Sequence, residues 1–403
     1  MRPLEEVRGL VLGSVPRLGT ETVPLGQALG RVLAQPIVSS QDVPHFANSA
    51  MDGYAVRATD VAGAGSVLEL IGEVPAGGVA SVEVAEGQAM RIMTGAPMPG
   101  GADTVVRVED TEESEGKVQI RGVVAAGTHV RAPGGDLRRG EEVFPEGTRL
   151  SATHLGVLAT VGITDPLVSN VPRVAVMSTG DELAPAESEE LGPGMIRDSN
   201  RPMLLAMLAE TGVEPLDLGA IGDDADLLRA AVGRAVLEAD VIVSSGGVSM
   251  GDYDMIKTVL AAESGVEMLQ VAMKPGKPFA FGLLGGRPFF GLPGNPVSVL
   301  VSFEQLVRPA LLSTQGATRV LRPRLTGTAG ERMESDPEKV EFVRARLEEG
   351  RVVRTGGQGS HVLSAAANAD FFALLDVGVS VVEESEEVVL ELFRSAASRE
   401  VGE

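Results

Sequence analysis

Apolar and polar positions follow different periods in successive parts of the chain, and the first change of period comes near residue 40. Before it, apolar residues recur at intervals of three and four, as on one face of a helix, at Leu4, Val7, Leu10, Val11, Leu25, Leu29 and Val32. Residues 1–40 are therefore predicted to be helical. Over residues 41–137, short alternating runs such as SVLELIGEV are separated by Gly- and Pro-rich turns, which predicts a β-rich domain.

A helical period returns in residues 138–170, where the segment SATHLGVLATVG ends at Gly162. The β-rich domain over 41–137 is thus predicted to be inserted into a helical and mixed linking domain, which consists of residues 1–40 and 138–170.

Residues 171–319 alternate short apolar runs with amphipathic segments. RVAVM, PLDLGAI and DVIVSS read as strands, and helices are predicted over SNRPMLLAMLAETG, DADLLRAAVGRAVLEA, DYDMIKTVLAAES and PVSVLVSFEQLV. This alternation predicts an α/β domain with a mostly parallel sheet wrapped by helices. Residues 320–403 return to short strands, such as VEFVRARLE and DFFALL, and form a predicted C-terminal β domain. The fold class is multidomain α/β and β.

Composition and charge narrow the possible partners. A chain of 403 residues is long enough for about two to four domains. Its 34 basic and 56 acidic side chains leave a net charge of −22, which argues against a nucleic-acid or anionic-membrane surface. A local cluster of Lys and Arg could still bind a small anion. With no Cys and four scattered His, a bound metal is expected to be a hard ion held by carboxylates.

The N-terminal segment MRPLEEVRGLVLGSV contains acids and lacks the layout of a signal peptide. No segment reaches the ~18 apolar residues of a membrane span. We therefore expect the protein in the cytoplasm and expect no membrane partner.

Three Gly-rich loops follow predicted strands of the α/β domain: STGDEL (178–183), SSGGVSMGDYD (244–254) and GLPGNPVS (291–298). The carboxyl ends of parallel strands meet at one edge of a sheet, where ligands bind. Glycine lets backbone approach a ligand closely, and the prolines of the third loop stiffen it before a helix N-terminus. The three loops together predict one pocket for a phosphorylated or nucleotide-like ligand.

Carboxylates lie beside these loops at Glu182, Asp223 and Asp254. Next to phosphates they would repel the ligand unless a divalent cation stood between them, and Mg²⁺ favours one or two carboxylates plus phosphate oxygens. Asp223 and Asp254 are the predicted metal ligands. The alternative for both is that they cap the helices that follow.

Two lysines, Lys274 and Lys277, lie on the Pro-Gly turn of KPGKPFAFG. Two ammonium groups on a stiff turn can trap an anion in an otherwise acidic protein. The alternative is a solvated surface turn. In the C-terminal domain, QGSHVLSAAANAD offers hydroxyls, including that of Ser364, together with His361.

The β-rich domain carries a second candidate site in NSAMDGYAV (48–56), where Asp52 lies among small residues and can be a functional carboxylate. The alternative for Asp52 is an Asp-Gly hairpin turn. Later segments of the same domain offer Thr94, Arg131 and Asp136.

Six motifs in this order resemble the bacterial MoeA proteins and the related E domain of gephyrin: NSAMDGYAV, IMTGAPMPGGAD, STGDEL, SSGGVS, KPGKPFAFG and GLPGNPVS. The resemblance covers nearly the whole chain. It implies a molybdopterin molybdenumtransferase, which converts adenylyl-molybdopterin and molybdate into molybdenum cofactor and AMP with a divalent metal, usually Mg²⁺. It also implies an elongated homodimer of four-part chains, with the molybdopterin adenylyltransferase and apo-molybdoenzymes as further partners.

The resemblance implies these site residues: Asp52, Thr94, Arg131, Asp136, Glu182, Ser249, Asp223, Asp254, Lys274, Lys277, Pro293, Pro296, Ser298 and Ser364. Asp52, Glu182, Thr94 and Asp136 are the catalytic candidates, and the others, apart from the two metal ligands, are expected to bind substrate. Molybdate is a dianion that needs cationic and hydroxyl donors. The expected set is Lys274, Lys277, Ser298, Arg344 and Ser364, with no acid among them. Asp52 would have to cross a subunit interface to join this pocket.

Three alternatives stay open at this point. The molybdopterin adenylyltransferase shares the α/β fold, but that family typically shows Gly-Gly-Thr-Gly where this chain has GGVSMG. A receptor-clustering scaffold like gephyrin would need additional domains. An inactive paralogue is the third, since Gln270, Asn368 and the RAPGGD stretch lack basic residues that many relatives carry. The sequence does not distinguish molybdate from tungstate.

Overall fold

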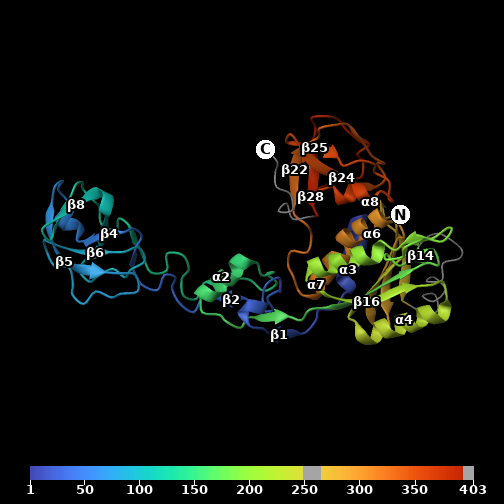
Figure 1. The fold of residues 1–403 in the computed structure, drawn as a ribbon, viewed down its shortest axis with the longest axis horizontal. Coiled ribbons are helices and arrows are strands. Elements are labelled where there is room, and N and C mark those ends of the chain that lie inside the picture. The colour runs from blue at the N-terminus through green and yellow to red at the C-terminus, as the bar shows by residue number, and fades with distance from the viewer. Residues whose placement is uncertain (248–264, 394–403) are drawn as a thin grey trace.

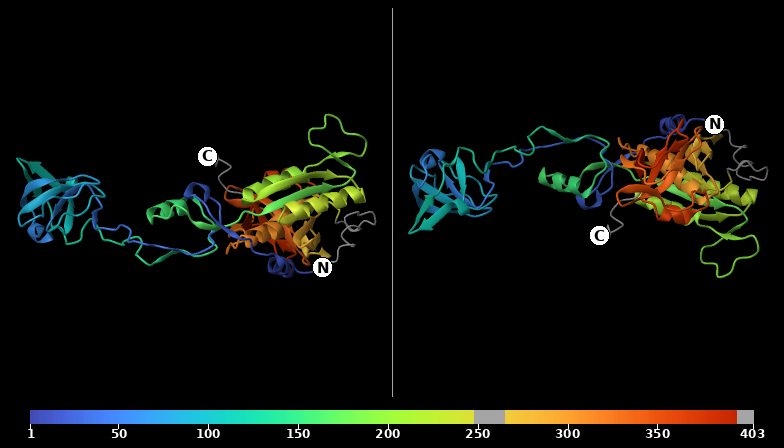
Figure 2. Two further views of the ribbon diagram at one scale, coloured as in Figure 1. Left: turned by 90° about the horizontal axis from the view of Figure 1, so that it is seen from below. Right: turned by 90° about the horizontal axis from the view of Figure 1, so that it is seen from above.

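The computed structural model describes residues 1–247 and 265–393. Figure 1 shows an elongated chain with a β domain at one end, a small linking domain in the middle, and the α/β and C-terminal domains together at the other end. The two views of Figure 2 show the same separation. The helices of residues 1–247 and 265–393 include no candidate membrane span.

The α/β domain is built on a six-stranded sheet in the order β16-β13-β17-β21-β20-β18. Its strands are β16 (Glu214–Ile221), β13 (Arg173–Thr179), β17 (Val241–Ser245), β21 (Arg287–Leu292), β20 (Pro278–Leu284) and β18 (Val266–Gln270). The first four are parallel, β20 runs antiparallel to them beside β21, and β18 pairs antiparallel with β20 at the edge. The mostly parallel sheet predicted from the alternation is confirmed.

The central strands β13, β17 and β21 are buried on both faces, which is why the sequence shows continuous apolar runs there. On β13, Val174 and Val176 face one hydrophobic cluster, and Ala175 and Met177 face the other. The first cluster also holds residues of α3 (Asn200–Thr211) and of the long helix made by α6 (Pro296–Ser302), the π-helical turn η4 (Phe303–Val307) and α7 (Arg308–Thr314). The second holds residues of α4 (Ala225–Glu238).

Side chains and a glycine cap the ends of α3 and α4. Gly212 ends α3 in the left-handed conformation, as predicted. Its N-cap, Ser199, makes no side-chain cap bond, and the carboxylate of Asp198 accepts from the backbone N–H of Arg201 instead. Asp224 caps α4 by accepting two backbone N–H groups, so the alternative reading of Asp223 as the cap was wrong.

The helical prediction for residues 1–40 was correct only for α1 (Leu4–Ser14). Beyond it lie short strands β1 (Thr20–Thr22) and β2 (Ile37–Val38) and the 3-10 turn η1 (Leu25–Gln27). Pro16, Pro24 and Gly30 interrupt this stretch, and its apolar residues pack in a turn-rich cluster around α2 (Ala152–Thr160). Helix α1 itself packs in the core of the α/β domain.

Residues 41–137, called the arm below, form a six-stranded sheet in the order β7-β4-β6-β5-β9-β8. The strands are β4 (Gly53–Val56), β5 (Val67–Val74), β6 (Gln88–Ile92), β7 (Thr104–Arg107), β8 (Thr111–Ser114) and β9 (Lys117–Ile120). The chain enters and leaves the arm side by side, through antiparallel pairs of β2 with β11 (Glu142–Phe144) and β3 (Asn48–Ser49) with β10 (Val130–Arg131).

The C-terminal domain contains β22 (Arg324–Thr328), β24 (Val340–Glu348), β25 (Arg351–Arg354), β26 (Phe371–Leu375) and β28 (Glu387–Leu392), with the short helix α8 (Leu363–Ala367). Its sheet receives one strand from the α/β domain. This is β19 (Met273–Lys274), which pairs in parallel with the start of β24. The lysine turn is therefore anchored to the C-terminal domain.

A buried ionic network joins the long helix to the start of the C-terminal domain. Glu304, only 5% exposed, accepts two hydrogen bonds from the guanidinium of Arg322, at 2.8 and 3.0 Å. Arg308 lies 4.0 Å from the same carboxylate, and burial lowers its pKa to about 10. Removing either partner would leave a buried charge uncompensated at this junction, which is costly.

Candidate functional site

The three Gly-rich loops lie against one another at the carboxyl ends of the parallel strands, over the part of them that the structure describes. The backbone N–H of Gly246 donates to the carbonyl of Leu292. A side chain at Gly246 would lie 2.5 Å from the carbonyl oxygen of Thr179, so only glycine fits between the first two loops. Ser249 and Asp254 lie outside the described residues.

Asn200, a residue that the motif search missed, connects two of these loops from the first turn of α3. Its amide donates to the Ser245 hydroxyl at 2.9 Å and to the Gly294 carbonyl at 2.6 Å. Asn200 is 9% exposed, and its own carbonyl oxygen has no hydrogen-bond partner among the described residues. Only the folded structure shows this role, because Asn200 is 45 residues from one partner and 94 from the other.

The acid-bearing loops are also joined. The Asp181 carboxylate accepts from the backbone N–H of Asp223 at 2.8 Å, which brings the loop of Glu182 beside the loop of Asp223. The carboxyl group of Glu182 is folded over Gly180, whose φ of +142° favours glycine. Since Asp224 caps α4, the exposed carboxylate of Asp223 remains available to a ligand.

The structure brings the predicted molybdate-binding segments together at the junction of the α/β and C-terminal domains. The backbone N–H of Val297, beside Ser298, donates to the carbonyl of Ser360. The guanidinium of Arg344 donates to the carbonyls of Gly357 and Gly359 in the same C-terminal segment. The lysine turn lies at the same junction, because β19, which ends at Lys274, pairs with β24.

The predicted members differ in accessibility. Lys277 and Ser364 are exposed, and the Lys277 ammonium has no side-chain partner among the described residues. Ser298 and Pro293 are buried, and Pro296 is the first residue of α6. Arg344 is 1% exposed, and burial lowers its pKa to about 10. Its Nε has no hydrogen-bond partner within residues 1–247 and 265–393.

The expectation that no acid lies among these cations was wrong. Lys274 forms an ion pair with Glu341, whose two carboxylate oxygens lie 3.1 and 3.2 Å from the ammonium nitrogen. Glu341 comes from β24, and its carboxylate is almost completely buried. No local sequence pattern indicates this ion pair, because Glu341 is 67 residues from Lys274 and lies in an ordinary strand segment.

A second constellation lies on the arm. The carboxylate of Asp52 accepts hydrogen bonds from the backbone N–H of Thr94 at 2.7 Å and from its hydroxyl at 2.8 Å. These bonds hold the pKa of Asp52 below its usual range, so the group is anionic at neutral pH. Arg131 ends the strand paired with Asn48, and exposed Asp136 lies at the base of the arm. The predicted grouping of Asp52 with Thr94 is therefore present.

The two constellations are separated within one chain. Strand β4, which begins directly after Asp52, lies in the arm at the far end of the molecule from β16 and α3 (Figure 1). In both views of Figure 2 the linking domain lies between the arm and the α/β domain.

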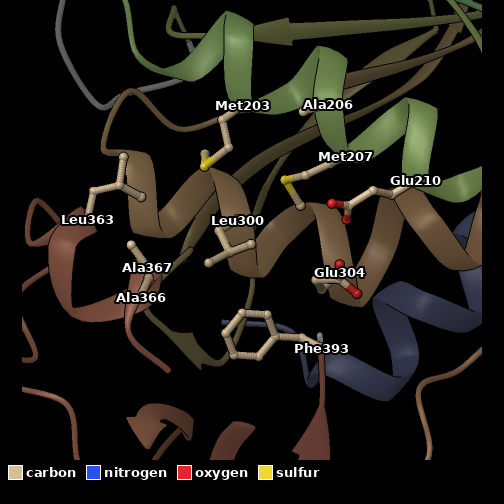
Figure 3. Close-up of a pocket in the computed structure, with 10 residues that line it drawn as sticks. All are labelled: Met203, Ala206, Met207, Glu210, Leu300, Glu304, Leu363, Ala366, Ala367 and Phe393. Carbon is tan, nitrogen blue, oxygen red and sulfur yellow. The ribbon is translucent and has the colours of Figure 1, made fainter. Parts of the chain in front are cut away.

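A cavity of about 280 Å³ opens elsewhere in the molecule, between α3, the long helix and α8. Figure 3 shows its lining: Met203, Ala206, Met207, Glu210, Leu300, Glu304, Leu363, Ala366, Ala367 and Phe393. The lining is mostly apolar, and its charged groups are acidic, which does not suit an anionic substrate. In the described part of the chain, no group of three or more His, Cys, Asp or Glu forms a ready metal cluster.

Models of known protein families match most of the chain. Residues 2–162 match the MoeA N-terminal region (domain I and II), residues 175–313 match a "Probable molybdopterin binding domain", and residues 326–393 match the MoeA C-terminal region (domain IV).

Individual relatives and solved structures show the same similarity to MoeA proteins. The chain is 38% identical to "Molybdopterin molybdenumtransferase 2" of Mycobacterium tuberculosis over 95% of this chain and 97% of the relative. It is 36% identical to "Molybdopterin molybdenumtransferase" of Haemophilus influenzae over 98% and 99%. A crystal structure of the molybdopterin biosynthesis MoeA protein from Pyrococcus horikoshii OT3 matches with a TM-score of 0.85 and 30% identity, over 98% of this chain and 100% of that one. The chain therefore belongs to the MoeA family of molybdopterin molybdenumtransferases.

Proposed function

We propose that this chain inserts molybdenum into adenylyl-molybdopterin, using molybdate and releasing AMP to form molybdenum cofactor. The observation that carries the proposal is a junction of three segments. They are the lysine turn, the GLPGNPVS loop and segment 357–364, to which Arg344 is hydrogen-bonded. Through the GLPGNPVS loop, this junction adjoins the other two Gly-rich loops. Cations at this junction suit a dianionic oxyanion, and Gly-rich loops beside it suit a nucleotide. Tungstate would fit the same charges.

The adenylate is assigned to the strand-end loops, and molybdate to Lys274, Lys277, Ser298, Arg344 and Ser364. Mg²⁺ is assigned to Asp223 and Asp254. Of these acids, Asp223 fits a hard cation, because its exposed carboxylate is not used as a helix cap. A bound Mg²⁺ would neutralise charge on the phosphates of the substrate.

Asp52 of the arm and Glu182 of the first loop are assigned as catalytic carboxylates, with Thr94 and Asp136 in support. Thr94 holds Asp52 in its anionic form, so Asp52 is suited to orient water or to stabilise positive charge rather than to donate a proton. Because the arm lies far from the α/β domain of its own chain, we assign the functional unit as a homodimer in which each arm completes its partner's pocket.

The direct test is reconstitution with purified protein. AMP should appear only when the adenylylated pterin, molybdate and Mg²⁺ are all present. Mass spectrometry of protein from a molybdate-starved host should detect an adenylylated pterin that co-purifies with it. Formation of the adenylylated pterin from ATP and molybdopterin, with no AMP release on adding molybdate, would indicate an adenylyltransferase instead.

Replacing Lys277 by Ala should raise the molybdate concentration needed for half-maximal AMP release by about ten- to a hundredfold, since one charge-assisted hydrogen bond is lost. Affinity for the adenylylated pterin should stay close to that of the unsubstituted protein. Lys117→Ala, an equal charge change at an exposed position of β9 in the arm, is the matched control. An unchanged molybdate dependence in Lys277→Ala would remove Lys277 from the oxyanion site.

A further inference from the structure

The buried carboxylate of Glu341 occupies a position that the assigned reaction does not explain. It lies on the second residue of β24, is 5% exposed, and faces the ammonium of Lys274 with both oxygens. Lys274 is half-exposed, so its ammonium reaches solvent on one side and Glu341 on the other. An ammonium has three donors, so it can hold this carboxylate and an incoming oxyanion together.

The surrounding charges make Glu341 the main counter-charge of the oxyanion-binding cations. Arg344 lies three residues further along β24, and the charge of Glu341 favours its protonated form against the effect of burial. Nearby Asp336 is already paired with Lys339. Lys277, the other lysine of the turn, has no acidic partner among the described residues.

We propose that Glu341 sets the oxyanion affinity of the site: it holds Lys274 in position when no oxyanion is bound, and its negative charge weakens binding of any free dianion. This inference rests on the proposed function, because it takes the Lys274 junction as the oxyanion site. The weakening keeps common dianions from blocking the cations before molybdate and the adenylylated pterin arrive.

Charge and hydrogen bonding give the proposal a specific chemical signature. Molybdate and sulfate are fully deprotonated dianions near neutral pH, so a nearby carboxylate can only repel them. Monohydrogen phosphate carries one O–H group, which can donate to the carboxylate and offset part of that repulsion. Removing the charge of Glu341 should therefore help molybdate and sulfate more than phosphate.

The test is Glu341→Gln in the full chain, with Kd values for molybdate, sulfate and phosphate measured by calorimetry. The Gln carbonyl can still accept from Lys274, so the hydrogen bond is kept while the charge is removed. We expect molybdate and sulfate to bind about tenfold more tightly, and phosphate to gain less. Glu348→Gln, on the same strand but exposed and paired with Arg346, is the control and should change none of these values.

A second variant distinguishes an effect of charge from an effect of side-chain geometry. It also keeps the proposal testable if Glu341→Gln does not fold. Glu341→Asp keeps the charge but shortens the side chain, so oxyanion binding should remain as weak as in the unsubstituted protein. Unchanged or weaker molybdate binding in Glu341→Gln, or tightening in Glu341→Asp, would overturn the proposal. If the unsubstituted protein binds neither AMP with Mg²⁺ nor any oxyanion, the proposed function fails instead, independently of Glu341.

Discussion

Refolding Asp52→Asn chains together with Glu182→Gln chains should restore about a quarter of the unsubstituted activity, although each variant alone should be inactive. The reason is the separation of the two acids within one chain. Asp52 is bound to Thr94 on the arm, while Glu182 folds over Gly180 beside the α/β sheet. An arm that reaches across a two-fold axis would place Asp52 of one chain in the pocket that holds Glu182 of the other.

The size of the recovery follows from random pairing. About half of the dimers would be mixed, and each mixed dimer would hold one pocket with both defects and one with neither. Loss of a catalytic carboxylate typically lowers the rate by about 10²–10⁴-fold, so the single variants should contribute little background. Asn at position 52 can still accept from Thr94, and both replaced residues are exposed, so folding should be preserved.

The control mixes the doubly substituted chain with the unsubstituted chain. Pockets shared between chains would give about a quarter of full activity from this mixture, whereas pockets within one chain would give about half. If the two single variants recover no activity on mixing, both acids act in the same chain. Sedimentation that shows only monomers at micromolar concentration would also contradict the dimer.

Replacing Asp223 and Asp254 together by Asn should abolish Mg²⁺-dependent AMP release, and Asp223→Asn alone should lower it by about a hundredfold or more. Without these carboxylates, a divalent cation would lose the protein ligands that hold it beside the substrate phosphates. Thermal stability should barely change for Asp223→Asn, because Asp223 is exposed and its backbone N–H, not its side chain, makes the bond to Asp181.

Asp224→Asn is the matched control, since it removes the same charge at the next position. Asn accepts backbone N–H groups at a helix N-cap about as well as Asp, so α4 should remain capped and AMP release should remain near normal. Measuring AMP release as a function of Mg²⁺ concentration distinguishes the Asp223→Asn variant from the Asp224→Asn variant. Equal behaviour of Asp223→Asn and Asp224→Asn would show that Asp223 is not a metal ligand.

Much of the α/β domain could be predicted because its signals are local. Strands buried on both faces must be apolar throughout, and glycines such as Gly162 and Gly212 end helices through a conformation that other residues avoid. The same reasoning failed beyond Ser14, where the helical spacing of Leu25, Leu29 and Val32 occurs in a turn-rich segment. Apolar residues there are placed by packing against residues 137–168, not by a helix of their own.

Apart from residues 15–40, the sequence by itself indicated the kinds of element and their order along the chain, and it determined the residue types available for an oxyanion and a nucleotide. Those properties depend on side chains near one another in the chain. Only the tertiary structure decided which groups face each other: Glu341 against Lys274, Asn200 between two loops, and Asp224 rather than Asp223 as the cap. These pairings depend on strand register and on backbone direction at each turn, and small free-energy differences summed over the whole fold decide both.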